Sequence, residues 1–267
     1  MSAPGIPMTA SPLVYITGAS SGIGQALAAR FHATGYRLAL VARRGAELQA
    51  WVDAQGWGAD RCRVYAADVR DVPGIVDAGR ACIAAQGVPD VVIANAGISV
   101  GVDTGVYDDL EVMRATYETN NLGMTASFHP FVGAMAQRGS GTLVGIASVA
   151  GIRGLPGHGA YCSSKAAVIS YCESLRGELR PNGVRVVTIV PGYVDTPLTR
   201  GNRYSMPFLL TAEVFADRAF RAIEAGASYR VIPWQMGLVG KLLRALPNAL
   251  YDRVLAGRPR KRRQGEA

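Results

Sequence analysis

The sequence is poor in the patterns that hold metal ions or disulfide frameworks. Its three histidines lie far apart, and none of its four cysteines is spaced as CxxC: Cys62, Cys82, Cys162 and Cys172. Zinc sites and small disulfide-rich domains need closely spaced or paired ligands. We therefore expect no metal site and no disulfide, and we infer a reducing, cytoplasmic setting.

Patterns typical of targeting and of membrane spans are also missing. The first residues, MSAPGIPMTASP, contain no basic side chain and no long apolar run, which argues against a secretory signal. A helix that spans a bilayer needs about 20 consecutive apolar residues. The apolar stretches near the C-terminus are shorter, so we expect no membrane span there.

Basic residues outnumber acidic residues, and most of the excess lies near the C-terminal end of the sequence. The sequence has 28 lysines and arginines against 20 acidic residues, a net charge of +8. Eight of the basic residues lie after residue 236, where only Asp252 and Glu266 oppose them. The rest of the chain is close to neutral, and the short basic end lacks the interleaved aromatic residues typical of nucleic-acid binding. We expect no nucleic-acid partner.

The sequence does contain a regular alternation of short apolar runs and longer helical patterns. Seven runs are strand candidates: 13–17, 37–42, 62–67, 90–95, 142–148, 184–190 and 229–233. Helices are expected between them, at 22–34, 44–55, 73–87, 108–136, 159–180 and 211–225. Strands that alternate with helices build a parallel sheet. The pattern predicts a single-domain α/β fold, a Rossmann-like, doubly wound, seven-stranded parallel sheet with helices on both faces.

Tyr161 and Lys165 are four residues apart on a predicted helix, so their side chains share one face. An ammonium group about 4 Å away favours the phenolate by about 4 kcal/mol at an effective dielectric constant of about 20. That is enough to lower the pKa of a phenol from about 10 to about 7. The same spacing also occurs on ordinary surface helices. Ser148, thirteen positions upstream, makes the pair a candidate active site.

The first predicted strand runs into a glycine-rich turn, TGASSGIG at 17–24. Glycines let the backbone turn tightly and approach a pyrophosphate, which is attracted by free amides and by the positive end of the next helix dipole. The spacing is G-xxx-G-x-G rather than G-x-G-xx-G. Its place after the first strand favours a dinucleotide site.

The end of the second predicted strand lacks the acidic residue that usually binds the ribose hydroxyls of NAD. It offers Arg43 and Arg44 instead, and the first acid is Glu47. An arginine at this place accommodates the extra phosphate of NADP. We expect NADP(H) as the cofactor. The alternative is that both arginines are solvated residues at the start of the next helix.

Together with NAG at 95–97, these motifs resemble the classical short-chain dehydrogenases/reductases over residues 12–235. The resemblance implies a catalytic tetrad: Asn120, Ser148, Tyr161 and Lys165. Tyr161 would transfer a proton, Ser148 would bind the substrate oxygen, Lys165 would act on Tyr161 and the nicotinamide ribose, and Asn120 would anchor a water molecule. Asn120 is chosen over its neighbour because the family places a glycine, here Gly123, three residues after this asparagine.

The resemblance also implies a cofactor site built from the glycine turn and the strand ends. Its residues are Thr17, Gly18, Ser20, Ser21, Gly22, Ile23, Gly24, Arg43, Arg44, Asp68, Val69, Asn95, Ala96, Gly97, Tyr161, Lys165, Pro191, Gly192, Val194 and Thr196. In this family Asp68 and Val69 would contact the adenine ring, and the residues after the sixth strand would border the nicotinamide.

Two connecting segments, 96–107 and 191–210, are long for simple connectors, and ligands in such folds bind beyond the carboxyl ends of the strands. We expect the substrate to contact Ser99, Ser148, Arg153, Leu155, Tyr161, Tyr193, Met206 and Phe208. The segments that supply these residues also contain Ile98, Val100, Ile152, Val194 and Leu209 and are mainly apolar, which favours a hydrophobic ketone or alcohol. Arg153, Arg200 and Arg203 leave open an anionic group on the substrate. Residues 193–211 are expected to form a mobile lid, and His158 to line the mouth of the cleft.

The last residues are predicted to extend beyond the family pattern. We divide the chain into a catalytic domain, 1–236, and a helical extension with a basic tail, 237–267. An apolar stripe in the extension is formed by Leu238, Val239, Leu242, Leu243 and Leu246. With the basic tail it suits the surface of an anionic membrane, on the inner side. Alternatively, the stripe packs on the body or on a partner subunit and the tail is solvated.

The sequence as a whole predicts an NADP(H)-dependent oxidoreductase that interconverts a carbonyl group and a secondary alcohol on a small hydrophobic molecule. The resemblance further implies a homodimer or homotetramer. The alternative function is a non-catalytic NADP(H)-binding sensor or scaffold, free or attached to a membrane surface. A complete set of Ser148, Tyr161 and Lys165 argues against that alternative, because a protein without chemistry does not need all three.

Overall fold

A computed structural model describes residues 11–202, 204–257 and 260–265 of the chain. Most of the N-terminal segment that argued against a secretory signal lies outside the described residues, as does Arg203.

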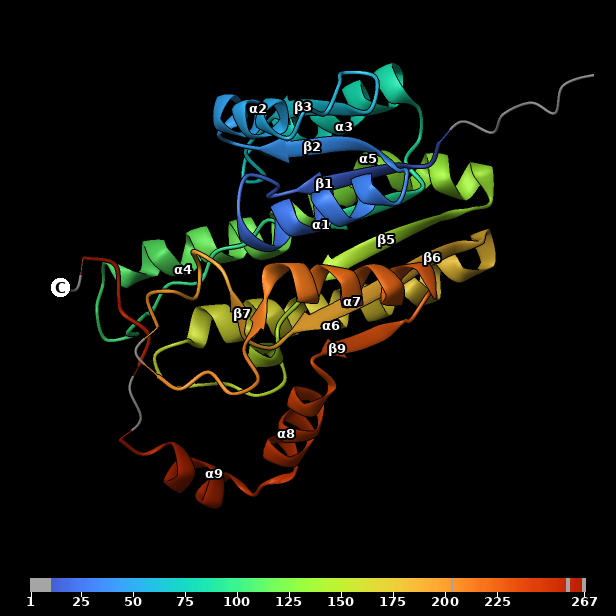
Figure 1. Cartoon of the computed structure of the whole chain (residues 1–267). Helices are drawn as coiled ribbons and strands as arrows, with labels where there is room; N and C mark the ends of the chain where they lie inside the picture. Colours follow the sequence, from blue (N-terminus) through green and yellow to red (C-terminus); the bar gives the residue numbers. More distant parts are fainter. Residues whose placement is uncertain (1–10, 203, 258–259, 266–267) are drawn as a thin grey trace, which may run out of the picture.

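The described residues form a seven-stranded parallel sheet in the order β3-β2-β1-β4-β5-β6-β9 (Figure 1). The strands are β1 (Leu13–Thr17), β2 (Arg37–Ala42), β3 (Cys62–Ala66), β4 (Val91–Ala94), β5 (Gly141–Ile146), β6 (Val184–Pro191) and β9 (Tyr229–Ile232). The chain moves outward from β1 to β3 and then returns to add β4 on the other side of β1. This reversal makes a crevice at the carboxyl ends of β1 and β4, where such sheets bind their ligands. The predicted fold class is confirmed, and all seven strands lie within two residues of their predicted bounds.

Helices cover both faces of the sheet. On one face lie α1 (Gly22–Ala33), α2 (Gly45–Ala54) and α7 (Ala212–Glu224); on the other lie α3 (Val72–Gln86), α5 (Gly123–Arg138) and α6 (Gly159–Leu179). Each layer has its own buried apolar core against the sheet. Double coverage explains why the central strands are mainly apolar and lack a polar alternate face, as in β1, which is buried at every position.

The stretch 108–136 was predicted as one helix, but the structure divides it. α4 (Asp109–Tyr117) passes into a π-helical turn (Glu118–Leu122) before α5 begins. A π turn holds one extra residue and so changes which side chains face inward. Here the turn contains Asn120, which is 1% exposed. The break was not predicted, because apolar residues recur with a helical period on both sides of the turn.

The long segment after β6 is tied at both ends. β7 (Val194–Asp195) pairs in parallel with β8 (Leu210–Thr211), a short ladder that the sequence did not predict. The residues between these two strands therefore form a closed loop over the carboxyl end of the sheet. This loop coincides with the predicted lid.

Two helices follow the last strand, α8 (Trp234–Ala245) and α9 (Asn248–Leu255), and they project from the body in Figure 1. α8 begins at Trp234, so the boundary proposed after residue 236 falls inside a helix. Within the described part of the chain, no helix combines the length and the apolar character that crossing a membrane requires.

Candidate active site

The glycine turn between β1 and α1 is folded tightly against β4. Asn95 holds it, because its side-chain amide donates to the carbonyl oxygens of Thr17 and Gly18 at 3.0 and 3.2 Å. Gly18 adopts φ 67°, a conformation that favours glycine. At Gly24 a Cβ would overlap the carbonyl oxygen of Gly18 and lie 2.8 Å from the Asn95 amide. Bulk is therefore excluded from the turn, and the first amides of α1 stay open to an anion.

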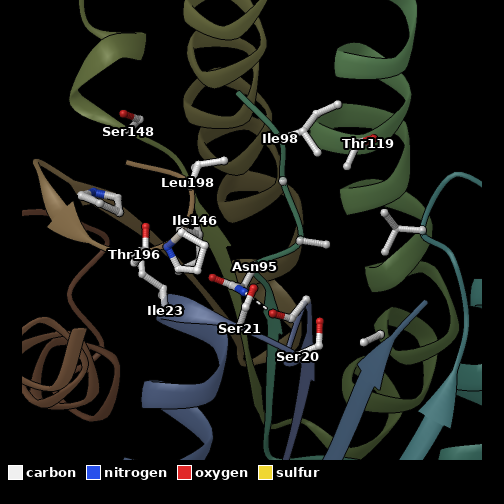
Figure 2. Close-up of a pocket in the computed structure, with 18 of the residues that line it drawn as sticks. Ser20, Ser21, Ile23, Asn95, Ile98, Thr119, Ile146, Ser148, Thr196 and Leu198 are labelled. Atoms are coloured by element: carbon white, nitrogen blue, oxygen red, sulfur yellow. Dashed lines mark hydrogen bonds between the residues drawn. The ribbon is translucent and has the colours of Figure 1, made fainter. Parts of the chain in front are cut away.

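A cavity of about 480 Å³ lies over this turn and the neighbouring strand ends. Ser20 and Ser21 lie toward one end of it and Ser148 at the other (Figure 2). Its volume falls in the range of small-molecule and cofactor sites. Most residues of the expected cofactor site line it: Gly18, Ser20, Ser21, Gly22, Ile23, Arg43, Arg44, Asp68, Val69, Asn95, Ala96, Gly97, Tyr161, Lys165, Pro191, Gly192, Val194 and Thr196.

Two residues of that expected site lie behind the lining. Thr17 is 1% exposed, and its hydroxyl accepts hydrogen bonds from the backbone amides of Asn95 and Ala96 at 3.1 and 3.3 Å. Gly24 is buried in the first turn of α1. Both shape the turn from beneath, so their part in cofactor binding would be indirect.

Three residues of the expected tetrad line the inner end of the cavity, and the fourth lies behind them. Ser148 follows β5 and lines the cavity, as do Tyr161 and Lys165 in the first turns of α6. Asn120 lies behind them, where its side chain accepts from the Ile98 amide at 2.8 Å and donates to the Ile98 carbonyl at 3.0 Å. Elements far apart in sequence thus bring a hydroxyl, a phenol and an ammonium group to one place.

Ser164 links Asn120 to the helix of the tyrosine. Asn120 Nδ2 donates to Ser164 Oγ at 2.9 Å, and Ser164 Oγ donates to the Tyr161 carbonyl at 2.8 Å. Ser164 is fully buried. Ser164 was not predicted as a site residue, although its place three residues after Tyr161 on α6 puts the two residues on one side of the helix.

Burial governs the acidity of the tyrosine and lysine pair. It raises the pKa of the Tyr161 phenol, while a hydrogen bond from Ser148 opposes the rise. It also lowers the pKa of Lys165 to about 8. Lys165 Nζ lies 5.9 Å from the centre of the Tyr161 ring and donates to the Ile146 carbonyl at 2.9 Å. The sequence led us to expect a lowered pKa for the Tyr161 phenol. That expectation included the attraction of the Lys165 ammonium for the phenolate but not the cost of burying a phenolate.

Two arginines stand at the outer end of the cavity, as expected for a phosphate site. Arg43 and Arg44 are mostly exposed, and each makes one loose ion pair, with Asp68 at 3.8 Å and with Glu47 at 3.3 Å. Exposed pairs of this kind are worth at most about 1 kcal/mol. Asp68 itself is partly buried, which acts to raise its pKa, but hydrogen bonds from Arg70 and the charges of Arg70 and Arg43 lower the pKa overall.

The expected substrate residues are only partly gathered at the cavity. Ser148 and Tyr161 line it. Six others lie outside its lining: Ser99, Arg153, Leu155, Tyr193, Met206 and Phe208. Beyond Tyr161 the rings of His158, Tyr204 and Tyr193 follow one another at centroid distances of about 6 Å, with 6.2 Å between His158 and Tyr161. Aromatic side chains therefore lie on the side of the phenol where the substrate is expected.

Arg153 is bound to the C-terminal helices. Its guanidinium donates to the carbonyl oxygens of Leu243 and Leu246 and to Asn248 Oδ1, and it lies 3.8 Å from the centre of the Tyr251 ring. These contacts cap the end of α8 and fix α9 to the loop after β5. Arg200 pairs with Asp195 at 3.1 Å. Both arginines thus have partners within the protein, and neither contact could be foreseen from sequence spacing.

The sequence profile of the short chain dehydrogenase family matches residues 12–206. An uncharacterized oxidoreductase of Myxococcus xanthus is 36% identical over 237 residues, which cover 89% of this chain and 93% of that protein. Similarity therefore extends past β9 and includes the segment that contains the four candidate catalytic residues.

Two solved structures have the same fold. A short chain dehydrogenase from Burkholderia cenocepacia, in complex with NADP, has a TM-score of 0.79 at 25% identity and covers 92% of this chain and 98% of its own. A short chain dehydrogenase/reductase from Burkholderia phymatum, in complex with NAD, has a TM-score of 0.78 at 23% identity and covers 93% and 96%. Proteins of this fold thus use either nicotinamide cofactor.

Proposed function

Since the chain belongs to the short-chain dehydrogenase/reductase family of oxidoreductases, we propose that it interconverts a carbonyl group and a secondary alcohol with NADP(H). The observation that carries this proposal is the placement of Ser148, Tyr161 and Lys165 together at the inner end of the cavity over the glycine turn. A small hydrophobic ketone or its alcohol is the substrate class that the apolar and aromatic surroundings favour.

The residues around the cavity fit a dinucleotide. The turn excludes side-chain bulk at Gly18 and Gly24, where a Cβ would meet backbone atoms, and α1 presents its positive end to the cavity. Arg43 and Arg44 are free enough to take a 2′-phosphate, because their present ion pairs are loose and exposed. This arrangement supports NADP(H) over NAD(H). When bound, the nicotinamide supplies the hydride that reaches the carbonyl carbon.

The protein's own groups then act on the substrate oxygen. Tyr161 donates its phenolic proton to the carbonyl oxygen, and in the reverse direction the phenolate removes the proton of the alcohol. Its raised pKa keeps the proton on the phenol at neutral pH, which suits the reducing direction. Ser148 donates a hydrogen bond to the same oxygen and fixes its position. Lys165 borders the site as a cation or a neutral amine, since burial lowers its pKa to about 8.

The variant Tyr161→Phe tests this role directly. We expect NADPH to bind as in the wild type, because the phenolic oxygen that the variant lacks is at the inner end of the cavity, far from the phosphate end. Turnover should fall by about 10²–10⁴-fold, because the proton donor is lost. NADPH fluorescence titration and NADPH oxidation on a panel of hydrophobic ketones give the two readings. Tyr107→Phe is the matched control, because Tyr107 is 84% exposed on the loop before α4. Normal turnover by Tyr161→Phe would refute the assignment.

The same panel separates an enzyme from a sensor. A sensor or scaffold would bind NADPH and oxidise it with none of the ketones, and the reverse assay on alcohols with NADP would also be silent. Turnover in either direction that depends on Tyr161 supports catalysis. The homodimer or homotetramer expected from the resemblance stays a prediction; light scattering of the purified protein measures it, and a monomer mass would contradict it.

We also propose that α8 touches an anionic membrane surface. Leu238 and Leu242 of the apolar stripe lie with Trp234 on one side of α8 at intervals of four residues. Trp234, Leu238 and Leu242 are 64%, 58% and 66% exposed, so these side chains do not pack on the body. Lys241 and Arg244 flank them, and α8 contains no acidic residue. A Trp and Leu face with basic neighbours suits anionic lipid headgroups. The cytoplasmic location expected from the sequence stays a prediction.

A further inference from the structure

The basic C-terminal segment 260–263, called the strap below, is not a solvated tail. It lies against the loop that follows β4, where the Gly101 amide donates to the Arg262 carbonyl at 2.9 Å and Gly101 forms a β-bridge with Arg263. In Figure 1 the red C-terminal end lies beside α4, above α9 in the view. The strap therefore returns from the helical extension to the substrate end of the body.

An ion pair latches the strap to α4. Arg263 donates from Nε and Nη2 to the two carboxylate oxygens of Asp109 at 2.7 and 3.1 Å. The Asp109 side chain is only 4% exposed, and it also accepts the backbone amide of Asp103 at 2.6 Å. Bidentate arginine and carboxylate pairs are strong and geometrically specific. The latch thus joins the end of the chain to the loop after β4.

The strap also contacts the loops after β5 and β6. Lys261 Nζ donates to the Leu198 carbonyl at 3.0 Å and to Asn202 Oδ1 at 2.6 Å, within the predicted lid. The side chain of Arg260 crosses Gly157, where an added Cβ would lie 3.0 Å from the Cβ of Arg260. One short segment therefore bridges all three loops that surround the substrate side of the sheet.

Close packing at Gly101 shows that the strap has a built seat. A Cβ at Gly101 would overlap the carbonyl oxygen of Lys261 and lie 2.6 Å from that of Arg262. Gly101 is not in the left-handed region, so its backbone does not by itself require glycine. The requirement comes from the strap. An alanine at this position must push the strap away without any change of charge.

The strap lies next to the aromatic side chains that fill the substrate side. His158 is 6% exposed, follows Gly157, and faces Tyr161 and Tyr204. Its Nε2 atom is buried and has no hydrogen-bond partner in the described part of the protein. The pKa of His158 is lowered to about 4 by burial and by the charge of Lys261, which places the strap lysine close to it. The cavity over the glycine turn is lined by Ser148 and Tyr161 but not by His158 or Tyr204.

We propose that the strap is a lid over the substrate entrance, latched by Arg263 and Asp109, and that it selects substrates by limiting the room beside Tyr161. The selection of substrates rests on the proposed reductase function. The covering of His158 by the strap does not depend on that function. In the closed state the three loops are held together around the reacting oxygen. In the open state the ketone or alcohol reaches the phenol.

Carbethoxylation by diethyl pyrocarbonate measures the lid without any turnover. The reagent modifies neutral imidazole, the state of His158 at pH 7, and peptide mass mapping compares His158 with the exposed His129 in the same sample. Access to a covered group follows the population of the open state. We expect Arg263→Gln and Gly101→Ala each to raise the His158 to His129 ratio by about tenfold, which corresponds to about 1.4 kcal/mol of strap docking.

Two variants that act by different physics guard against a simple folding defect. Arg263→Gln removes a charge, while Gly101→Ala removes none and acts by overlap. Arg262→Gln is the matched control, because Arg262 is exposed in the same strap and loses the same charge. Equal His158 ratios in the wild type and both test variants would overturn the lid. A rise in Arg262→Gln as large as in Arg263→Gln would overturn the latch.

Substrate selection is read from kcat/KM on a small and a bulky ketone. We divide kcat/KM for the bulky ketone by kcat/KM for the small ketone. If entry of the substrate limits the rate, this quotient should rise by about tenfold in both test variants, the same factor as the His158 to His129 modification ratio. An unchanged kinetic ratio with an increased His158 ratio would refute selection by the lid. Failure of the proposed function looks different, since the wild type would then reduce no ketone while the His158 ratios still report on the strap.

Discussion

The buried imidazole of His158 couples the stability of this protein to pH. The folded state holds its pKa at about 4, first through burial and then through the charge of Lys261. The ordinary value is about 6.5 in an unfolded chain. Between these values the unfolded chain binds a proton that the folded protein does not, so acidification favours unfolding. The stability that neutral His158 permits is complete above about pH 6.5 and is lost as the pH falls toward 4.

The size of the effect follows from the two pKa values. The full difference of about 2.5 units corresponds to about 3 kcal/mol, and the part lost between pH 7 and pH 5 is about 2 kcal/mol. His158 is only 6% exposed, so little of this is screened by solvent. His32, whose pKa is lowered by burial and by Arg61, adds a loss of the same sign. The contribution of His158 must therefore be isolated by substitution.

The variant His158→Phe keeps an aromatic ring against Tyr161 and Tyr204 but cannot take up a proton. Urea unfolding at pH 7 and pH 5 gives the free energy of unfolding at each pH for the wild type, this variant and a His129→Phe control, which is exposed. We expect the decrease between the two pH values to be smaller by about 2 kcal/mol in His158→Phe and unchanged in the control. An equal decrease in all three proteins would show that His158 is not buried in its neutral form.

Two further predictions concern the cofactor and the membrane. Arg43→Ser with Arg44→Ser should weaken NADPH binding by about 10²–10⁴-fold and leave NADH binding within about twofold, because each arginine that pairs with the 2′-phosphate contributes about 1.5–3 kcal/mol. Equal losses for both cofactors in a fluorescence titration would contradict a phosphate site. Leu238→Gln with Leu242→Gln should abolish co-sedimentation with vesicles that contain phosphatidylserine, while Leu122→Gln, which changes an exposed leucine elsewhere, should not. Equal partitioning of all these proteins would rule out contact through α8.

Much of the fold could be read from local pattern. The seven strands were predicted within two residues because each is a short apolar run between turn residues, and their alternation with helices fixes a parallel sheet. The glycine turn was recognisable because it follows the first strand. The division of 108–136 at the π turn was missed, since a π turn leaves the hydrophobic period on each side nearly unchanged.

Expectations about single side chains depended more on their surroundings. Tyr161 and Lys165 were predicted as neighbours and do border one cavity, but the expected lowering of the phenol pKa was wrong, because burial opposes the phenolate more than the hydrogen bond with Ser148 favours it. Arg153 looked available to a substrate, yet it caps α8. Spacing along the sequence shows which side chains share one face of a helix. The solvation of each side chain depends on the residues that pack over it.

The sequence by itself determined the sheet and the order of its motifs, because these follow from local periodicity and from residue type. The expected set of Asn120, Ser148, Tyr161 and Lys165 came from the family resemblance that these motifs carry. Only the tertiary structure decided where the C-terminal segment goes. Lys261 and Arg263 read as part of a solvated basic tail, but they lie against loops about 60 and 150 residues earlier in the chain. Contacts between residues so distant in sequence leave no periodic pattern, so only the folded structure shows that this segment lies against the middle of the chain.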